Sequence, residues 1–249
     1  MNLFHVIVLG LIQGFTEFLP ISSSGHLLLF EKLFGLNGNL LVFDIFLHLG
    51  TLFAVCFCYR KEILYLLKHP FCDKAKKLYL ASGVTVVLVI IFKKFLLNSF
   101  SSSILPFCFL ITALLLMLAS NMIKKNHTKK ISYLSSVIIG AMQGVACLPG
   151  ISRSGATLST SLLLKNEKNE SLSFSFLLSI PIILASLVFS LFEVGFQGVN
   201  IYLAIIGIAV SFLSGLISIK FLKVVIEKKS LIYFALYLLI LALVLFLAL

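Results

Sequence analysis

The stretch GLIQGFTEFLPISSSGH, residues 10–26, decides the fold because GAMQGVACLPGISRSGA, residues 140–156, repeats it 130 positions later. Chance composition does not explain matching of this density in a polar, glycine-rich sequence. We therefore predict an internal repeat. The identical pairs are Gly10 and Gly140, Gln13 and Gln143, Gly14 and Gly144, Ile21 and Ile151, Ser22 and Ser152, Ser24 and Ser154, and Gly25 and Gly155.

Each copy lies within an apolar segment, Leu3–Leu36 or Ser132–Lys165, that its Ser, Gly and Pro residues interrupt halfway. An interrupted segment is a poor single membrane span, but it forms a helix, a loop and a second helix that enter and leave on one side. Irregular backbone survives at membrane depth only where protein or water satisfies its N–H and C=O groups. The sequence therefore predicts two re-entrant helix–loop–helix segments.

The composition around these segments is that of a membrane protein. Hydrophobic residues make up 60% of the chain, charged residues make up 12%, and the mean hydropathy is +1.14. Soluble domains contain roughly 45–50% apolar and about 25% charged residues. Lipid must therefore be the solvent for much of this surface.

Six further apolar runs approach the ~20 residues that a helix needs to cross a bilayer. Together with the two interrupted segments they predict an all-α polytopic membrane protein with six transmembrane helices and two re-entrant segments. We expect a single membrane domain, residues 1–249, with repeat halves at about 1–123 and 131–249. The six runs are Leu40–Tyr59, Leu78–Phe92, Ile104–Ile123, Leu172–Phe192, Ile201–Leu222 and Leu231–Leu249, of which Leu78–Phe92 is short unless it continues to Leu97.

The net charge of +11 is distributed as in a polytopic protein. Basic residues gather between apolar runs, at 60–77, 124–130 and 220–229, and do not form one face with aromatic side chains, which argues against nucleic-acid binding. Cytoplasmic loops retain Lys and Arg, so we place these loops inside and both termini outside. Three spans then separate the two copies of the motif. Because the number of spans between them is odd, the second copy enters the membrane from the opposite face to the first. The broken segments of such inverted repeats meet near the midplane of the membrane.

The two copies differ where chemistry would differ. Glu17 is replaced by Cys147, Ser23 by Arg153 and His26 by Ala156. The first copy thus carries an acid, a hydroxyl and an imidazole, and the second carries a guanidinium. This favours one asymmetric site, assembled from both halves, over two equivalent sites.

In the first copy, Gln13 and Glu17 are four residues apart and share a helix face, and Pro20 ends that helix. Ser22, Ser23 and Ser24 then open the next helix, whose positive N-terminus suits an anion. An ionisable residue at membrane depth marks a functional site by default. The alternatives are that Glu17 only caps the serine loop and that His26 is a structural imidazole.

In the second copy, Arg153 offers a planar fork of donors that matches phosphate oxygens. Ser152, Ser154 and Thr157 complete a phosphate cradle around it. The alternative is that Arg153 is only a charge at the cytoplasmic interface. Asp44 and His48, four residues apart at the start of the next span, either face the same cavity or are a helix-end residue and a packed histidine.

The two motifs, QGFTEFLPISSSGH at residues 13–26 and PGISRSGAT at residues 149–157, closely resemble the signature motifs of the bacterial undecaprenyl-diphosphate phosphatases, or bacitracin-resistance proteins. The hydropathy pattern is similar over essentially the whole chain. The resemblance implies hydrolysis of undecaprenyl diphosphate to undecaprenyl phosphate and inorganic phosphate, which recycles the carrier lipid for cell-wall synthesis and confers bacitracin resistance. It also implies a site that opens to the outer face of the bacterial cytoplasmic membrane, and Mg²⁺ or Ca²⁺ as cofactor.

Diphosphate hydrolysis needs charge neutralisation, a nucleophile and a proton donor for the leaving phosphate. We assign Arg153 to the phosphate oxygens and leave three arrangements open. Ser23 is the nucleophile with Glu17 or His26 as base; His26 is the nucleophile with Glu17 orienting it; or Glu17 and Gln13 hold a divalent cation that polarises phosphate or water. Ser22, Ser24, Ser152, Ser154 and Thr157 are the expected phosphate donors.

Two rival functions share this architecture. Secondary transporters are built from inverted repeats with broken helices, and a polyprenyl-phosphate flippase would combine lipid binding with alternating access. A pure carrier does not need Glu, Ser and His on one repeat opposite Arg on the other, so the asymmetry favours a hydrolase. The expected partners are a polyprenyl diphosphate and membrane lipid, with a homodimer as one option.

Overall fold

The computed structural model describes residues 1–36, 40–93, 104–123, 125, 127–193, 200–228 and 230–248. Over these residues the regular structure is α-helical, and the β-structure consists of an isolated bridge between Lys129 and Asn166. The predicted class, an all-α polytopic membrane protein, is confirmed. The possible continuation of the second span to Leu97 and the last residue of the predicted domain lie outside the described ranges.

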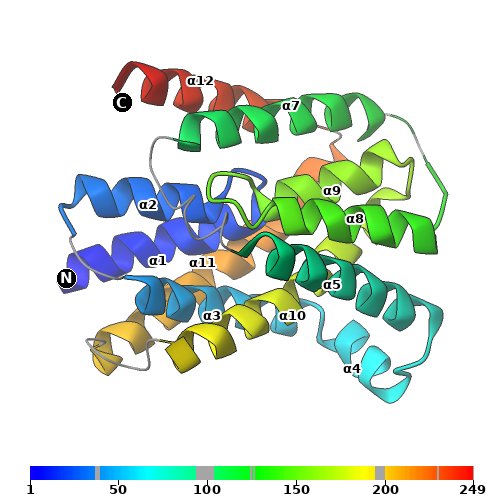
Figure 1. Cartoon of the computed structure of the whole chain (residues 1–249), viewed down its shortest axis with the longest axis horizontal. Coiled ribbons are helices and arrows are strands. Elements are labelled where there is room, and N and C mark those ends of the chain that lie inside the picture. Colours follow the sequence, from blue (N-terminus) through cyan, green and yellow to red (C-terminus); the bar gives the residue numbers. More distant parts are fainter. Residues whose placement is uncertain are drawn as a thin grey trace.

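Two helix–loop–helix hairpins lie where the repeated motifs predict them. The first consists of α1 (Leu3–Phe18) and α2 (Ser23–Leu33), and the second of α8 (Tyr133–Val145) and α9 (Arg153–Leu163). In each hairpin a proline follows the first helix, where a ring that removes an N–H and fixes φ is compatible with the turn. In Figure 1 the two hairpins occupy opposite sides of the molecule, and the loops between their helices meet near its middle.

The remaining long helices are α3 (Leu41–Cys58), α5 (Asp73–Ile91), α7 (Leu105–Ile123), α10 (Lys168–Glu193), α11 (Ile201–Glu227) and α12 (Ile232–Ala248). Among the described residues, four helices are long and apolar enough to cross a membrane: α3, α7, α10 and α11. Of the other two, α12 has only 17 residues and α5 begins with the charged residues of the preceding loop. The count of six spans and two re-entrant segments stays a prediction.

A short helix, α4 (Arg60–Lys68), occupies part of the segment 60–77 that the sequence analysis treats as a loop. Arg, Lys, Glu and Leu are good helix formers and need no tertiary contact to favour a turn of helix. Its residues are not buried. Figure 1 places α4 at one end of the molecule, beyond the end of α3.

The helices pack in pairs that the repeat relates. The first helix of one hairpin, α1, packs on α11, and its counterpart α8 packs on α5; α7 packs on α12, and α3 packs on α10. An inverted repeat would give this pairing, because exchange of the two halves converts each pair into another pair or into itself. The division into halves at 1–123 and 131–249 stays a prediction.

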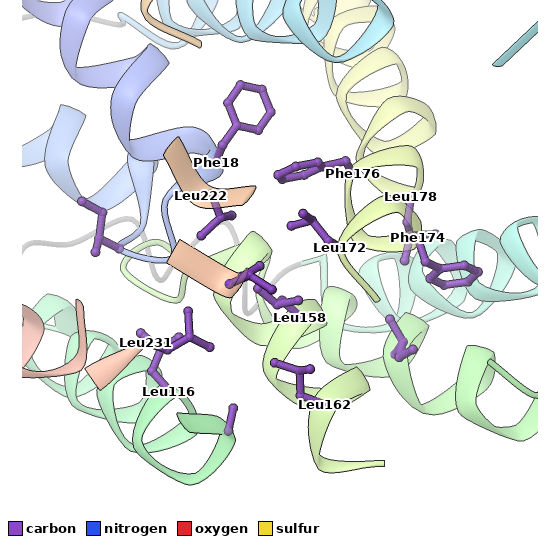
Figure 2. Close-up of a cluster of buried hydrophobic side chains, with 14 of the residues drawn as sticks. Phe18, Leu116, Leu158, Leu162, Leu172, Phe174, Phe176, Leu178, Leu222 and Leu231 are labelled. Carbon is purple, nitrogen blue, oxygen red and sulfur yellow. The ribbon is translucent and has the colours of Figure 1, made fainter. Parts of the chain in front are cut away.

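The largest hydrophobic cluster lies between elements of both halves (Figure 2). Phe18, at the end of α1, packs edge-on against Phe176 of α10, with 5.3 Å between ring centroids. Leu158 and Leu162 of α9 approach the same cluster from the other hairpin, and Leu116 of α7 closes it. The apolar core therefore holds the two hairpins in a fixed relation.

Small residues allow the closest helix approaches. A Cβ on Gly140 of α8 would lie 2.3 Å from the carbonyl oxygen of Ala81 in α5, and Thr85 of α5 donates a hydrogen bond of 2.8 Å to the Gly140 carbonyl. A similarly close approach occurs at Gly14 of α1, on which a Cβ would lie 2.6 Å from the carbonyl oxygen of Ser211 in α11. Both contacts are to backbone, which cannot give way as a flexible side chain can.

We expect Gly140→Ala to lower the thermal unfolding midpoint of the detergent-purified protein, because the added methyl group separates α8 from α5. Overpacking of this kind costs roughly 1–3 kcal/mol. Gly83→Ala on α5 is the matched control, since a Cβ there has nothing within 4 Å and alanine favours helix over glycine. Equal midpoints for Gly140→Ala and the unmodified protein would contradict the packing.

Candidate active site

The loops of the two hairpins are in direct contact. A Cβ on Gly25 would lie 3.1 Å from the Cα of Gly150, and one on Gly155 would lie 3.2 Å from the Cβ of Pro20. The Ser154 hydroxyl donates to the Leu19 carbonyl at 3.3 Å. Residues about 130 positions apart in the chain thus form one junction.

Two helices begin at this junction. Ser22 caps α2 and accepts a hydrogen bond from the Gly25 N–H at 3.4 Å, and Ser152 caps α9 and accepts one from the Gly155 N–H at 3.0 Å. Ser22 has φ +71°, a left-handed conformation that non-glycine residues seldom adopt and that costs of order 1–3 kcal/mol. Strain of this kind persists only where the surrounding structure fixes the backbone. The contacts of the junction therefore fix the backbone at Ser22, where α2 starts.

The Glu17 carboxylate lies at the centre of the junction and is buried. Its Oε1 pairs with the Arg153 guanidinium from the other hairpin. Its Oε2 accepts hydrogen bonds from the Ser23 hydroxyl at 2.6 Å and from the Gln13 amide at 3.0 Å. The structure therefore brings together Glu17, Ser23, Gln13 and Arg153, four of the residues that the sequence analysis selected.

One donor of Arg153 is left over. While Nη2 contacts Glu17, Nη1 is buried and has no partner among the described residues. A buried guanidinium N–H without an acceptor is costly, so this atom is suited to an incoming anion. The site thus presents one unused cationic donor beside a hydroxyl that is bonded to a carboxylate.

His48 also belongs to this site, a placement that the sequence analysis left open. Its Nδ1 lies 2.7 Å from the Gln13 Nε2 and 3.3 Å from the Glu17 Oε2, and its backbone carbonyl accepts from Thr51 at 2.8 Å. The signal was its position one turn after Asp44, at the start of an apolar span. Spacing alone did not reveal which face of α3 meets α1.

Contacts with α2 and α12 hold His26 beside the junction. Its Nδ1 bonds to the Ser22 carbonyl at 2.7 Å and its Nε2 to the Tyr237 hydroxyl at 2.7 Å, and the ring is stacked on Tyr237 and tilted against Phe109. Both nitrogens therefore have partners, a backbone carbonyl and a tyrosine hydroxyl. Of the described contacts of His26, none joins it to Glu17 or Arg153.

The predicted phosphate donors lie around the junction in unequal positions. Ser22 and Ser152 act as helix caps, and the Ser154 hydroxyl lies 3.3 Å from that of Ser152. Thr157 is fully buried and is hydrogen-bonded to Ser175 at 2.6 Å. Ser24 is the half-buried member of the serine run. Whether each of them contacts phosphate stays a prediction.

The predicted pair of metal ligands, Glu17 and Gln13, does not fit a divalent cation in this arrangement. The amide nitrogen of Gln13, not its oxygen, faces the carboxylate, and Arg153 and Ser23 already use the carboxylate oxygens. Across the described part of the chain, no three His, Cys, Asp or Glu side chains form a metal-binding group. The cation at these two residues therefore stays a prediction, and no step below depends on it.

Comparisons with known proteins agree on one family. A family described as "Bacitracin resistance protein BacA" matches residues 6–244. The chain is 40% identical to an undecaprenyl-diphosphatase of Carboxydothermus hydrogenoformans, over 95% of this chain and 94% of that protein. It is 41% identical to one of Thermosipho africanus, over 96% and 98%, and 38% identical to one of Halothermothrix orenii, over 95% and 94%.

The buried ion pair predicts a specific pattern of stabilities. Arg153→Met should lower the free energy of unfolding by about 3–5 kcal/mol, because it leaves the Glu17 charge buried without its partner. Adding Glu17→Gln removes that charge, so the double variant should regain a large part of the loss. Denaturant unfolding in detergent measures both. A double variant as unstable as Arg153→Met would contradict a direct pairing of the two charges.

Proposed function

Since the chain belongs to the bacitracin resistance protein BacA family, we propose that it hydrolyses undecaprenyl diphosphate to undecaprenyl phosphate and inorganic phosphate. The observation that carries the proposal is the contact of the Glu17 carboxylate with both Ser23 and Arg153. It joins a nucleophile, a base and a phosphate-binding cation from the two halves of the chain. The protein is thus a membrane phosphatase that recycles a carrier lipid for cell-wall synthesis and confers bacitracin resistance.

Binding of the diphosphate uses the positive groups of the junction. The unpartnered Nη1 of Arg153 donates a hydrogen bond to an oxygen of the terminal phosphate, and the N-termini of α2 and α9 add their partial positive charge. The site is buried, so these interactions act at a low effective dielectric constant and are stronger than they would be in water. The negative charge that develops on the transferred phosphoryl group is neutralised in the same place.

Ser23 is the nucleophile that this geometry supports best. Its hydroxyl already donates to the Glu17 Oε2 at 2.6 Å, within the range of a proton transfer to a general base. The Oγ attacks the terminal phosphorus, the proton passes to Glu17, and the bond to the bridging oxygen breaks to release undecaprenyl phosphate. Glu17 passes this proton to the departing undecaprenyl phosphate. It then takes a proton from water, whose oxygen attacks the phosphoserine, and returns that proton to the departing Ser23 Oγ.

The other two arrangements have less support. His26 as nucleophile would have to leave the Ser22 carbonyl and the Tyr237 hydroxyl, which hold its two nitrogens. We assign it to positioning α2 against α12. A cation at Glu17 and Gln13 would require the amide to turn and the carboxylate to exchange partners.

The lipid tail and the orientation follow from the helices around the site. Exposed apolar side chains cover α7, α11 and α12, among them Leu114, Ile217 and Ile240, a surface suited to lipid. We place the protein in the bacterial cytoplasmic membrane with the first hairpin entering from the outer face, since basic loops stay in the cytoplasm. The homodimer stays a prediction.

The difference between the two hairpins also argues against the transporter and flippase alternatives. The second hairpin places Cys147 and Ala156 at the positions of Glu17 and His26, so exchange of the halves would not recreate the site. Alternating access through two equivalent half-sites gains nothing from a carboxylate paired to a hydroxyl on one side only. A hydrolase requires this asymmetry.

We expect Arg153→Ala to reduce phosphate release from undecaprenyl diphosphate by about 10³-fold or more, as loss of a transition-state cation does elsewhere. Ser23→Ala should have an effect of similar size and should exceed that of Ser24→Ala. Arg60→Ala, an exposed arginine of α4, is the matched control and should keep full activity. Near-normal turnover of purified Arg153→Ala or Ser23→Ala would exclude the assigned role of that residue.

The orientation is tested by labelling. In a background without the five native cysteines, Asn200→Cys, at the start of α11, should react in intact cells with a membrane-impermeant maleimide. Thr128→Cys, in the basic segment before α8, should react only after the membrane is opened. Both positions are exposed. The opposite pattern would place the basic loops outside.

A further inference from the structure

The short helix α4 carries an apolar face that the protein covers only in part. Residues three or four apart share a face of a helix, which gathers four apolar side chains of α4: Ile63, Leu64, Leu66 and Leu67. Ile63 and Leu66 are half-buried against the largest hydrophobic cluster. Leu64 is 56% exposed and Leu67 is 72% exposed. The function proposed above uses none of these side chains.

The size and pattern of α4 are those of a helix that lies on a membrane. Its nine residues span roughly 14 Å at 1.5 Å per residue, which is far too short to cross a bilayer. Lys61 and Lys68, each within one turn of Tyr65, lie on the other face. A helix with an apolar face and lysines opposite lies in the plane of the lipid headgroups. Figure 1 places α4 at one end of the molecule, so the lipid of one leaflet covers its exposed apolar side chains.

A cavity of about 310 Å³ lies where α4 begins. Residues from the end of α3, the start of α4 and α11 line it: Cys58, Tyr59, Arg60, Lys61, Glu62 and Lys223. Three of these six side chains are cations and one is an anion, so the cavity has a net positive charge. The contact of α3 with the Glu17 junction comes from His48, in the first half of that helix. The cavity, at the opposite end of α3, is therefore a separate site.

Two of the four charged side chains of the cavity are already engaged. Glu62 pairs with Lys74 of α5, so a residue outside the cavity lining neutralises its charge. Arg60 donates a hydrogen bond to the Phe57 carbonyl at 3.0 Å, and its guanidinium lies over the Phe57 ring. These contacts hold Arg60 on the end of α3. The charge that remains for a ligand is that of the two lysines.

The two lysines of the cavity, Lys61 and Lys223, come from different helices and have no acidic partner. Both residues are exposed, and neither forms an ion pair with a carboxylate in the part of the chain that the structure describes. The Lys223 Nζ lies 4.8 Å from the centroid of the Tyr59 ring. A cation–π contact orients the ammonium group and leaves its N–H donors for a ligand. An anion between α4 and α11 would therefore meet two ammonium groups.

We propose that Lys61 and Lys223 bind the phosphate headgroup of an anionic phospholipid, whose acyl chains lie against Leu64 and Leu67. Lysine binds phosphate as a point charge. A lipid with a net negative charge, such as phosphatidylglycerol, matches the two lysines, whereas phosphatidylcholine carries its own cation beside the phosphate. The lipid belongs to the leaflet at the basic end of the protein, which we place in the cytoplasm.

Fluorescence quenching tests the site, because the chain contains no tryptophan and an introduced one reports on a single position. Leu67→Trp is placed in phosphatidylcholine nanodiscs that hold a fixed fraction of lipid with brominated acyl chains. Brominated phosphatidylglycerol should quench this tryptophan about twofold or more relative to brominated phosphatidylcholine at the same fraction. Ile240→Trp on α12, which is 65% exposed and outside the cavity lining, is the control. The two brominated lipids should quench it equally.

Two pairs of lysines separate the cavity from the general charge of this surface. In the Leu67→Trp protein, Lys61→Gln combined with Lys223→Gln should remove the preference for phosphatidylglycerol. Lys76→Gln combined with Lys228→Gln removes the same charge from exposed residues outside the cavity lining, and this variant should keep the preference. Thermal unfolding midpoints in detergent check that both double variants are folded.

Equal quenching of Leu67→Trp by the two lipids would overturn the proposal. So would a preference that survives the loss of Lys61 and Lys223. An equal loss of preference in both double variants would also overturn it, since the surface potential of the basic end would then be the cause. None of these measurements uses hydrolysis, so failure here leaves the proposed phosphatase function untouched.

Discussion

The contact between Glu17 and Arg153 is the constraint on which the rest of the molecule depends. A carboxylate and a guanidinium are expensive to bury separately, and each lies at a helix end beside a loop whose irregular backbone also needs partners. Their contact meets both requirements, because it holds the two loops together at the point where α2 and α9 begin. The hydrophobic cluster around Phe18 and Leu158 then fixes the same relation from the apolar side.

Duplication explains the frame of the site, and divergence explains its chemistry. Both hairpins keep a serine cap and a glycine on the third residue after it, so both helices start in the same way. Equal halves would bring two acids or two guanidiniums to the junction. Placing the acid and hydroxyl on one copy and the cation on the other removes that repulsion and gives the phosphate a single direction of approach.

Much of this was predictable from sequence, for identifiable reasons. Pro20 and the serine run fixed the end of α1 and the start of α2, and helix spacing placed Gln13 beside Glu17. His26 was left open between a catalytic and a structural role because its orientation depends on Tyr237, 211 residues away, and a contact at that separation leaves no local pattern. His48 was undecided for a related reason: only the packing of α3 on α1 shows which of its faces meets Glu17.

The Glu17 charge has its cation in the other half of the chain, so this one contact joins the two halves. A phosphate that competes for Arg153 loosens the contact during catalysis. The hydrophobic cluster around Phe18 and Leu158 keeps the two hairpins in place, because it does not depend on that charge pair. The catalytic end of the first hairpin can therefore exchange partners without separating the two halves.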